Sequence, residues 1–214
     1  VLCLQHSGRN VFMNAERARL MRTWLYADNL KAFTDLLTSD ITKMYIEHGT
    51  YAWVRLNTLS DVMWERRLGP DWFKKWEGKI GGFYDYTKLP YRHRYDMPDN
   101  YHLTYSFSEK TDDREFFDNI ANGRNVAVTF FVCRNDHKLE CRHKCVCPLT
   151  PTFKGIPVID GDVHDHRPID PPNRVVGLRL KQPRKGGGIR WQEVVARATQ
   201  ARDKGEPSFV QIPN

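Results

Sequence analysis

Apolar residues recur at helical spacing through the first quarter of the chain. The positions that carry this period are Leu20, Trp24, Leu25, Phe33, Leu36, Leu37, Ile41 and Met44. The pattern predicts one or two helices over residues 14–48, inside an N-terminal helical segment 11–48, with Asn14 as the capping residue. Gly49 follows the last apolar position and is expected to end the helix.

Short apolar runs alternate with helical stretches through the rest of the chain. The expected strands are YAWVRLN (51–57), GGFYDY (81–86), YHLTYSFS (101–108), NVAVTFFV (125–132), IPVID (156–160), RVVGLRLK (174–181) and the C-terminal EPSFVQIPN (206–214). Helices are expected at residues 71–79, with Trp72, Phe73 and Trp76 on the buried side, at 112–123 and at 191–201. Asp112 and Glu115 form a capping-box pattern. This alternation predicts an α/β fold in a single domain, 1–214.

Reactive side chains follow almost every predicted strand. They are Thr58, Ser60 and Asp61; Thr87 and Lys88; Glu109 and Lys110; Asp162, His164 and Asp165; and Lys181. The carboxyl ends of parallel strands line the functional face of α/β folds, so these side chains are expected to gather at one edge. Ordinary polar loops are the alternative.

Five sequence blocks and the N-terminal start carry a resemblance to a known family. The blocks are VRLNTLSDVMWE, FYDYTK, YHLTYSFSE, NVAVTFF and IPVIDGDVHDHRPIDP, preceded by SGRN and ERARLMRT. In order and spacing they resemble an uncharacterised bacteriophage protein family. The resemblance implies a partial (β/α) barrel with mostly parallel strands, similar to radical-SAM-like proteins and to base transglycosylases. It also implies the cytoplasm of an infected bacterial host. A cysteine-rich insertion at 133–150 departs from the family pattern.

The segment DGDVHDHRPIDP (160–171) concentrates ionisable side chains after one predicted strand. Aspartates close to a histidine can bind a divalent metal or act as base and nucleophile. Arg167 can hold a phosphate or fix an aspartate in place. An ordinary turn is the alternative. Together with the exit of the first strand, the predicted catalytic residues are Asp61, Asp160, Asp162, His164 and Asp165.

The segment YDYTK (84–88) predicts a grip for nucleic acid. In a strand, Tyr84 and Tyr86 share one face with Lys88 beside them, while Asp85 and Thr87 take the other face. Tyrosine and lysine suit base stacking and phosphate contact. Aromatic residues that fill a core are the alternative. The predicted substrate- or nucleic-acid-binding residues are Asn57, Tyr84, Tyr86, Lys88, Arg92, Arg94, Arg167, Lys181, Arg184 and Lys185.

Four of the five cysteines lie close together, at Cys133, Cys141, Cys145 and Cys147. Four thiolates at this spacing can form a tetrahedral zinc site, which would be structural. The gap between the last two cysteines is shorter than usual in zinc sites, and free thiols on a loop are the alternative. The three-cysteine spacing of a radical-SAM cluster is absent from the sequence.

Composition favours a polyanionic partner. Lys plus Arg number 33 against 26 Asp plus Glu, a net charge of +7, and no stretch is apolar enough to span a membrane. The sequence therefore predicts a phage-type protein acting on nucleic acid, as a base-modifying or nucleic-acid-processing enzyme that uses the strand-exit aspartates. The alternative is a non-catalytic module that binds nucleic acid or a host protein and serves replication or counter-defence.

A third hypothesis is a tyrosine nuclease of the rolling-circle type. In such an enzyme a histidine pair binds metal and a tyrosine attacks the DNA phosphate. Here His164 and His166 would be the pair and the tyrosines of YDY the nucleophiles. Two features weigh against it: the residue between the histidines is charged, and the tyrosines precede the histidines.

Overall fold

The computed structural model describes residues 12–92, 96–108, 110–130 and 148–179. These residues fall into two compact units. The N-terminal unit takes its residues from Cys3–Asp85 and Asp96–His102, and the C-terminal unit takes its residues mainly from Tyr86–Tyr95 and Leu103–Asn214. Each unit is described by itself below, and the single domain predicted for 1–214 stays a prediction.

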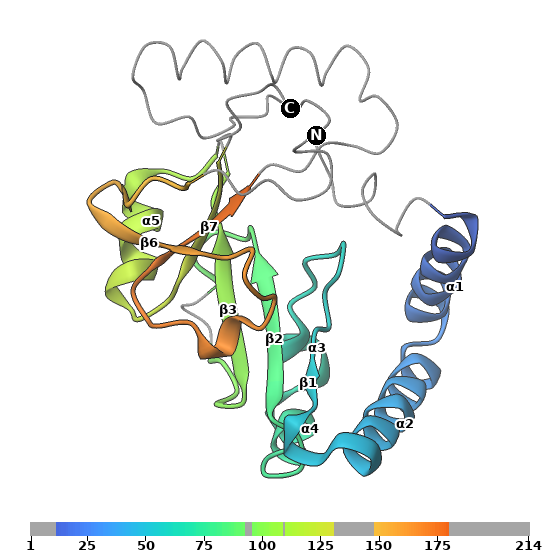
Figure 1. Ribbon diagram of the computed structural model, residues 1–214. Coiled ribbons are helices and arrows are strands. Elements are labelled where there is room, and N and C mark those ends of the chain that lie inside the picture. Colours follow the sequence, from blue (N-terminus) through green and yellow to red (C-terminus); the bar gives the residue numbers. More distant parts are fainter. Residues whose placement is uncertain (1–11, 93–95, 109, 131–147, 180–214) are drawn as a thin grey trace. The chain divides into compact units, whose positions relative to one another are not determined.

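The described strands form a mostly parallel sheet (Figure 1). Their order is β1 (Trp53–Val54), β2 (Gly82–Thr87), β3 (Tyr101–Ser106), β4 (Val126–Phe130), β7 (Val175–Arg179), β6 (Ile156–Asp160) and β5 (Thr152–Phe153). The pairs β1–β2, β3–β4, β4–β7 and β6–β7 are parallel, and β5–β6 is antiparallel. The α/β prediction is confirmed. The described strands do not close into a barrel, because β1 and β5 are the two edges, and the barrel resemblance is not confirmed.

The predicted N-terminal helical region is confirmed as two helices, α1 (Met13–Asp28) and α2 (Leu30–His48). They are interrupted at Asn29, whose side-chain oxygen accepts a hydrogen bond from the backbone N–H of Ala32 at 2.9 Å and so caps α2. The prediction that Asn14 caps the first helix is wrong, because α1 already begins at Met13 and Asn14 lies inside its first turn. Gly49 ends α2 as predicted, with φ at 56°.

Two elements of the N-terminal unit are shorter than the sequence predicts. The strand expected at 51–57 is reduced to β1, because the chain turns at Asn57 to bond with the side chain of Asp85 instead of continuing the ladder. The helix expected at 71–79 is reduced to α4 (Pro70–Lys74), which follows the short helix α3 (Trp64–Leu68).

Aromatic rings form the core of the N-terminal unit. Phe73 is fully buried, and its ring centroid lies 5.1 Å from that of Trp72 and 5.0 Å from that of Phe83. The ring of Tyr101 stacks on Phe73 at 5.2 Å with 15° between the planes. Trp72, Phe73 and Trp76 are all buried, as the sequence predicts. This core fixes β2 and β3 against α4.

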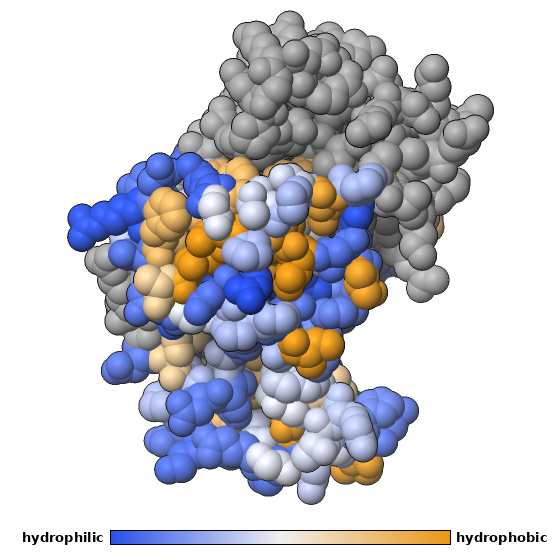
Figure 2. All heavy atoms as spheres, turned by 60° about the vertical axis from the view of Figure 1, so that its left-hand side comes forward, coloured by the Kyte–Doolittle hydropathy of each residue, from blue (hydrophilic) through white to orange (hydrophobic). Residues whose placement is uncertain are grey.

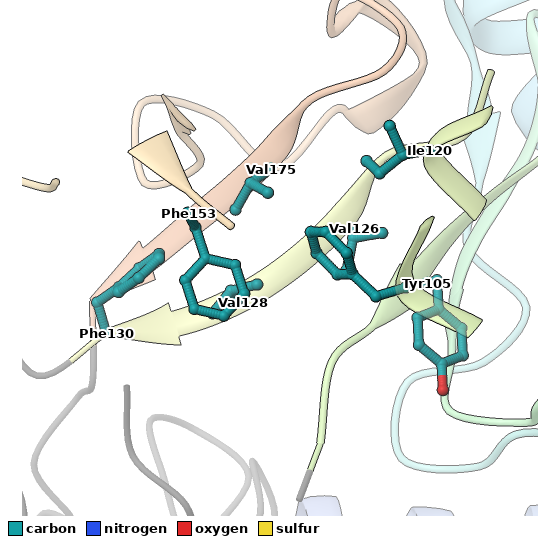
Figure 3. Packing of buried hydrophobic residues seen from close by; sticks show 8 residues of the cluster. Tyr105, Ile120, Val126, Val128, Phe130, Phe153 and Val175 are labelled. Atoms are coloured by element: carbon teal, nitrogen blue, oxygen red, sulfur yellow. The ribbon is translucent and has the colours of Figure 1, made fainter. Parts of the chain in front are cut away.

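Helix α5 (Asp113–Ala121) covers β4 in the C-terminal unit. Its predicted cap is confirmed, since Asp112 accepts a hydrogen bond from Glu115 N at 2.7 Å. Figure 3 shows the hydrophobic cluster beneath it, with side chains from α5 and from the strands. Phe153 packs edge-on against three other rings of this cluster, those of Phe107, Phe116 and Phe130.

Hydrophobic groups also reach the surface of the described part. Figure 2 shows one face, where hydrophobic residues stand in scattered groups among hydrophilic ones. The exposed large residues include Met13, Leu20, Trp24, Ile46 and Tyr51. Among the described residues, no helix combines the length and the hydrophobicity that crossing a bilayer requires.

Candidate functional site

The carboxyl ends of β6 and β7 carry a clasp formed by Arg179, Asp160 and Asp162. The guanidinium of Arg179 donates to both carboxylate oxygens of Asp160, Nη1 to Oδ1 at 2.7 Å and Nη2 to Oδ2 at 2.8 Å. Asp162 Oδ2 lies 3.2 Å from Nη1 and also accepts from the backbone N–H of Arg179 at 2.9 Å. Two of the four predicted catalytic aspartates, Asp160 and Asp162, therefore bind an arginine of the neighbouring strand.

The clasp is possible because β6 and β7 run parallel in a fixed register. Asp160 pairs with Gly177, so the side chain of Arg179, two residues further along β7, lies beside the end of β6. The backbone N–H of Asp162 donates to Asp160 Oδ1 at 3.0 Å and turns the chain at this point. The DGD sequence thus forms the ordinary turn that was weighed as an alternative, and the turn also positions both carboxylates.

The clasp changes the proton affinity of its members. The hydrogen bond from Arg179 holds the pKa of Asp160 below its usual value, and burial only partly opposes this effect. The hydrogen bond to Asp160 raises the pKa of Arg179 above its already high ordinary value. Asp160 is therefore ionised near neutral pH. A carboxylate with a lowered pKa and an engaged pair of oxygens is a weak general base.

A second arginine, Arg167, lies fully buried inside the loop that follows β6. Its Nη2 donates to the backbone oxygens of Gly161, at 3.2 Å, and of His164. Nη1 lies 3.3 Å from Asp170 Oδ2 in a buried ion pair. Of the two roles considered for Arg167, this geometry fits the fixing of an aspartate, and it leaves the guanidinium no surface for a phosphate.

His164 lies between Arg167 and Asp170. Arg167 Nη2 is 3.2 Å from His164 Nδ1, and His164 Nε2 is 3.6 Å from Asp170 Oδ1. The side chain of His164 is 36% exposed, whereas that of Asp170 is 4% exposed. Burial raises the pKa of Asp170, and the positive charge of Arg167 partly offsets the increase. Burial also lowers the pKa of the neighbouring His166. Asp165 is exposed on the same loop.

The strand β2 shows the alternation predicted for YDYTK. Asp85 and Thr87 are buried on one face, Tyr84 and Tyr86 are half-buried on the other, and Lys88 is exposed just beyond the strand end. This arrangement leaves the nucleic-acid grip of Tyr84, Tyr86 and Lys88 as a prediction. Arg92, in contrast, is only 1% exposed, so its side chain is not at the surface where a nucleic acid would bind.

Asn57, a predicted binding residue, is the centre of a buried polar network in the N-terminal unit. It is 2% exposed. Its Oδ1 accepts hydrogen bonds from Ser60 Oγ at 2.7 Å, Val62 N at 3.1 Å and Trp64 Nε1 at 3.0 Å. These bonds hold the loop that connects β1 to α3. The geometry favours a structural role for Asn57.

The same network reaches Asp85 and Tyr101. Asp85 is fully buried and accepts hydrogen bonds from Asn57 N at 2.7 Å and from Tyr101 OH at 2.6 Å. Sequence analysis placed Asp85 on the strand face opposite the two tyrosines, and it missed Tyr101 as its partner. The three-residue spacing of Asn57 and Ser60 is a local signal for a side-chain turn, but nothing local pointed to Tyr101.

Several predicted site residues belong to different units or lie outside the described ranges. Asp61 belongs to the N-terminal unit, and Asp160 and His164 belong to the C-terminal unit, so their shared pocket stays a prediction. Within the described residues, no group of three or more His, Cys, Asp or Glu is arranged to hold a metal ion. The predicted residues outside the described ranges are Arg94, Cys133, Cys141, Cys145, Cys147, Lys181, Arg184 and Lys185.

The described residues thus define a mixed α/β protein with a mostly parallel sheet, in which one arginine–aspartate clasp joins the ends of β6 and β7. The chain belongs to the gene product 88 family, whose model matches residues 1–203. This match agrees with the phage protein family that the sequence blocks resemble. No curated protein and no solved structure matches the chain.

Proposed function

We propose that this member of the gene product 88 family is a nucleic-acid-binding protein that makes no catalytic use of Asp160 and Asp162. The observation that carries the proposal is the clasp of Arg179 with Asp160 and Asp162. A general base or nucleophile needs a free lone pair directed at the substrate. In the clasp, both oxygens of Asp160 and one oxygen of Asp162 already accept hydrogen bonds from Arg179.

The distribution of charge supports nucleic acid as the ligand. In the described residues, Lys plus Arg equal Asp plus Glu in number, so the whole net charge of +7 belongs to the remaining sequence. Residues 180–214 alone contain seven Lys or Arg and three Asp or Glu. Arginine and lysine attract phosphates, and their binding releases counterions, so affinity should fall steeply as salt rises. Within the described part, Arg179 is paired with Asp160 and Arg167 with Asp170, so the proposal assigns phosphate binding to the basic sequence outside the described ranges.

Fluorescence anisotropy of labelled single-stranded and duplex DNA and RNA tests this proposal. We expect binding at low salt with a negative slope of log affinity against log salt. The triple variant Lys181→Ala, Arg184→Ala, Lys185→Ala should reduce that slope by about one for each lost phosphate contact. Asp165→Asn, at an exposed acid, serves as the matched control and should leave the slope unchanged. Absence of binding to all four probes at low salt would overturn the proposal.

A second candidate function is catalytic, and the pairing of His164 with Asp170 favours it. A buried carboxylate beside a partly exposed imidazole is the arrangement in which an aspartate orients a histidine that acts as general base. Nucleoside analysis by mass spectrometry, after incubation of DNA or RNA with the protein, tests this candidate. A modified nucleoside or released base that disappears in His164→Asn but persists in His48→Asn, the same change at an exposed histidine of α2, would support it. Unaltered nucleosides with the wild-type protein would exclude it for the substrates tried.

A further inference from the structure

Helix α1 exposes an unusual amount of apolar surface. Met13 is 83% exposed, Leu20 63%, Met21 65% and Trp24 82%. None of the sixteen residues of α1, all of which the structure describes, is buried. A single exposed apolar residue is ordinary on a protein surface, whereas a contiguous group of large ones marks an interaction site.

The exposed side of α1 is opposite the side that packs. Near the end of the helix, Tyr26 contacts the rings of Phe33 at 5.5 Å and Trp64 at 5.6 Å, and its hydroxyl accepts a hydrogen bond from Arg67 at 3.0 Å. The half-buried residues of α1, namely Ala15, Ala18, Arg19, Leu25 and Tyr26, lie on this inner side.

With 3.6 residues per turn, Met13, Leu20 and Trp24 fall together on the opposite side of the helix. We call Met13, Arg17, Leu20, Met21, Trp24 and Asp28 the outer stripe of α1.

Helix α2 shows how a solvent-facing side looks in the same unit. Its exposed side also contains apolar residues, Leu36 and Ile46, but it carries the ion pairs Lys31–Asp35, at 2.7 Å, and Asp40–Lys43, at 3.2 Å, which α1 lacks on its outer stripe among the described residues. Figure 1 shows α1 and α2 joined end to end. An isolated helix of this length is marginal in water, and most helical stability comes from packing of an apolar side. We therefore expect the apolar residues of the outer stripe to pack against a partner.

The charges on the outer stripe indicate what the partner is. Arg17 lies in its first half and Asp28 at its end, and both are exposed. Two copies of α1 in antiparallel orientation, with the two-fold axis between Arg22 and Thr23, bring each Arg17 opposite Asp28 of the other copy. The same arrangement brings Met21 opposite Trp24, a favourable sulfur–aromatic pair. In a parallel pair, like charges would instead face each other.

We propose that the protein forms a symmetric dimer through the outer stripes of two antiparallel α1 helices. The interface is isologous, so every contact occurs twice, as in most protein dimers. Trp24 and Met21 supply the apolar centre, and Arg17 and Asp28 close it at both ends.

Analytical ultracentrifugation of the full chain over a range of concentrations tests this proposal, and Leu20 and Leu36 provide a matched pair of variants. Leu20→Glu changes the outer stripe, and Leu36→Glu makes the same change at a leucine of α2 that is 57% exposed. We expect the wild type and Leu36→Glu to be dimers, and Leu20→Glu to raise the dimer dissociation constant at least about tenfold. Circular dichroism checks that both variants keep their helix content. A wild type that stays monomeric, or equal effects of the two variants, would overturn the proposal.

A charge swap tests the antiparallel orientation. Arg17→Glu alone and Asp28→Arg alone each place like charges opposite one another and should weaken the dimer, by about two- to fivefold at low salt. The double variant restores two ion pairs in reversed order and should recover the wild-type dissociation constant. Failure of the double variant to recover it would refute the antiparallel pairing. If the outer stripe instead packs against another part of its own chain, the protein stays monomeric at every concentration. That result would refute the proposal that a second copy covers the stripe.

Discussion

Replacing Tyr101 with phenylalanine removes one hydroxyl from the buried network of the N-terminal unit and leaves the aromatic packing in place. The hydroxyl donates a hydrogen bond to Asp85 Oδ2 at 2.6 Å. Both residues are buried, with Tyr101 5% exposed and Asp85 fully buried. The phenylalanine ring keeps the stacking on Phe73 and the edge contact with Phe83. The variant therefore isolates one hydrogen bond.

The expected cost follows from the surroundings of the Asp85 carboxyl. A hydrogen bond to a buried acceptor contributes about 1–3 kcal/mol once the desolvation of the abandoned group is included. Water cannot readily replace the lost hydroxyl, because Asp85 is 0% exposed. The bonds from Asn57 remain and limit the loss. We expect Tyr101→Phe to lower the free energy of unfolding of the N-terminal unit by about 2 kcal/mol.

Urea denaturation followed by tryptophan fluorescence measures this loss in the right unit. Five of the six tryptophans, Trp24, Trp53, Trp64, Trp72 and Trp76, belong to the N-terminal unit. Tyr51→Phe is the matched control, because Tyr51 is 92% exposed and should tolerate the change within about 0.3 kcal/mol. If Tyr101→Phe lowers stability by no more than the Tyr51 variant, the network does not stabilise this unit, and the structural role assigned to Asn57 and Asp85 fails with it.

Three further predictions concern the C-terminal unit. The pKa of Asp160 is lowered in the folded protein, so ionised Asp160 stabilises the fold above the pKa of the unfolded chain, and this stabilisation is lost as pH falls through the pKa of the folded state. Asp160→Asn should therefore flatten the acid side of a plot of melting temperature against pH. An unchanged profile would contradict the clasp. Arg179→Met should cost about 0.5–1 kcal/mol at neutral pH in thermal denaturation, since Asp160 is partly exposed. Gly161→Ala would bring a methyl group within 2.5 Å of Val176 Cγ1 and 2.9 Å of Arg167 Nη1, so it should cost about 1–3 kcal/mol; a neutral result would show that the loop adapts freely.

Local signals in the sequence predicted the elements that depend on local chemistry. The helix α5 was predicted from the Asp112–Glu115 capping-box pattern, and the cap at Asp112 forms as expected. The carboxylate of Glu115, however, accepts from Tyr91 N at 2.9 Å instead of returning to the cap. A distant backbone group thus replaced the local partner. Pattern reasoning has no access to such a contact, because the two residues are far apart in the chain.

The candidate site shows the same limit more strongly. The sequence shows that acidic residues follow β6, but it does not show that their partner is Arg179. Arg179 ends β7, and it meets Asp160 only because β7 lies parallel to β6 in one particular register. Whether an acidic residue at a strand end is available for chemistry therefore depends on the side chains of the neighbouring strand. The alternation of β2 predicted which face carries Asp85, yet it could not reveal that Tyr101 donates to it.

The distribution of charged residues suggests two separate roles for them, stabilising the fold and binding a polyanion. In the described part, basic and acidic residues are equal in number, and prominent pairs such as Arg179 with Asp160, or Arg167 with Asp170, neutralise each other inside one unit. Clasps of this kind stabilise a fold but give a polyanion nothing to bind. The surplus of positive charge belongs to sequence outside these ranges. On this argument, Arg179→Met should change stability with little effect on nucleic-acid affinity, whereas the Lys181, Arg184, Lys185 variant should do the reverse. If Arg179→Met instead weakened nucleic-acid binding as much as the Lys181, Arg184, Lys185 variant does, this division of charge would be refuted.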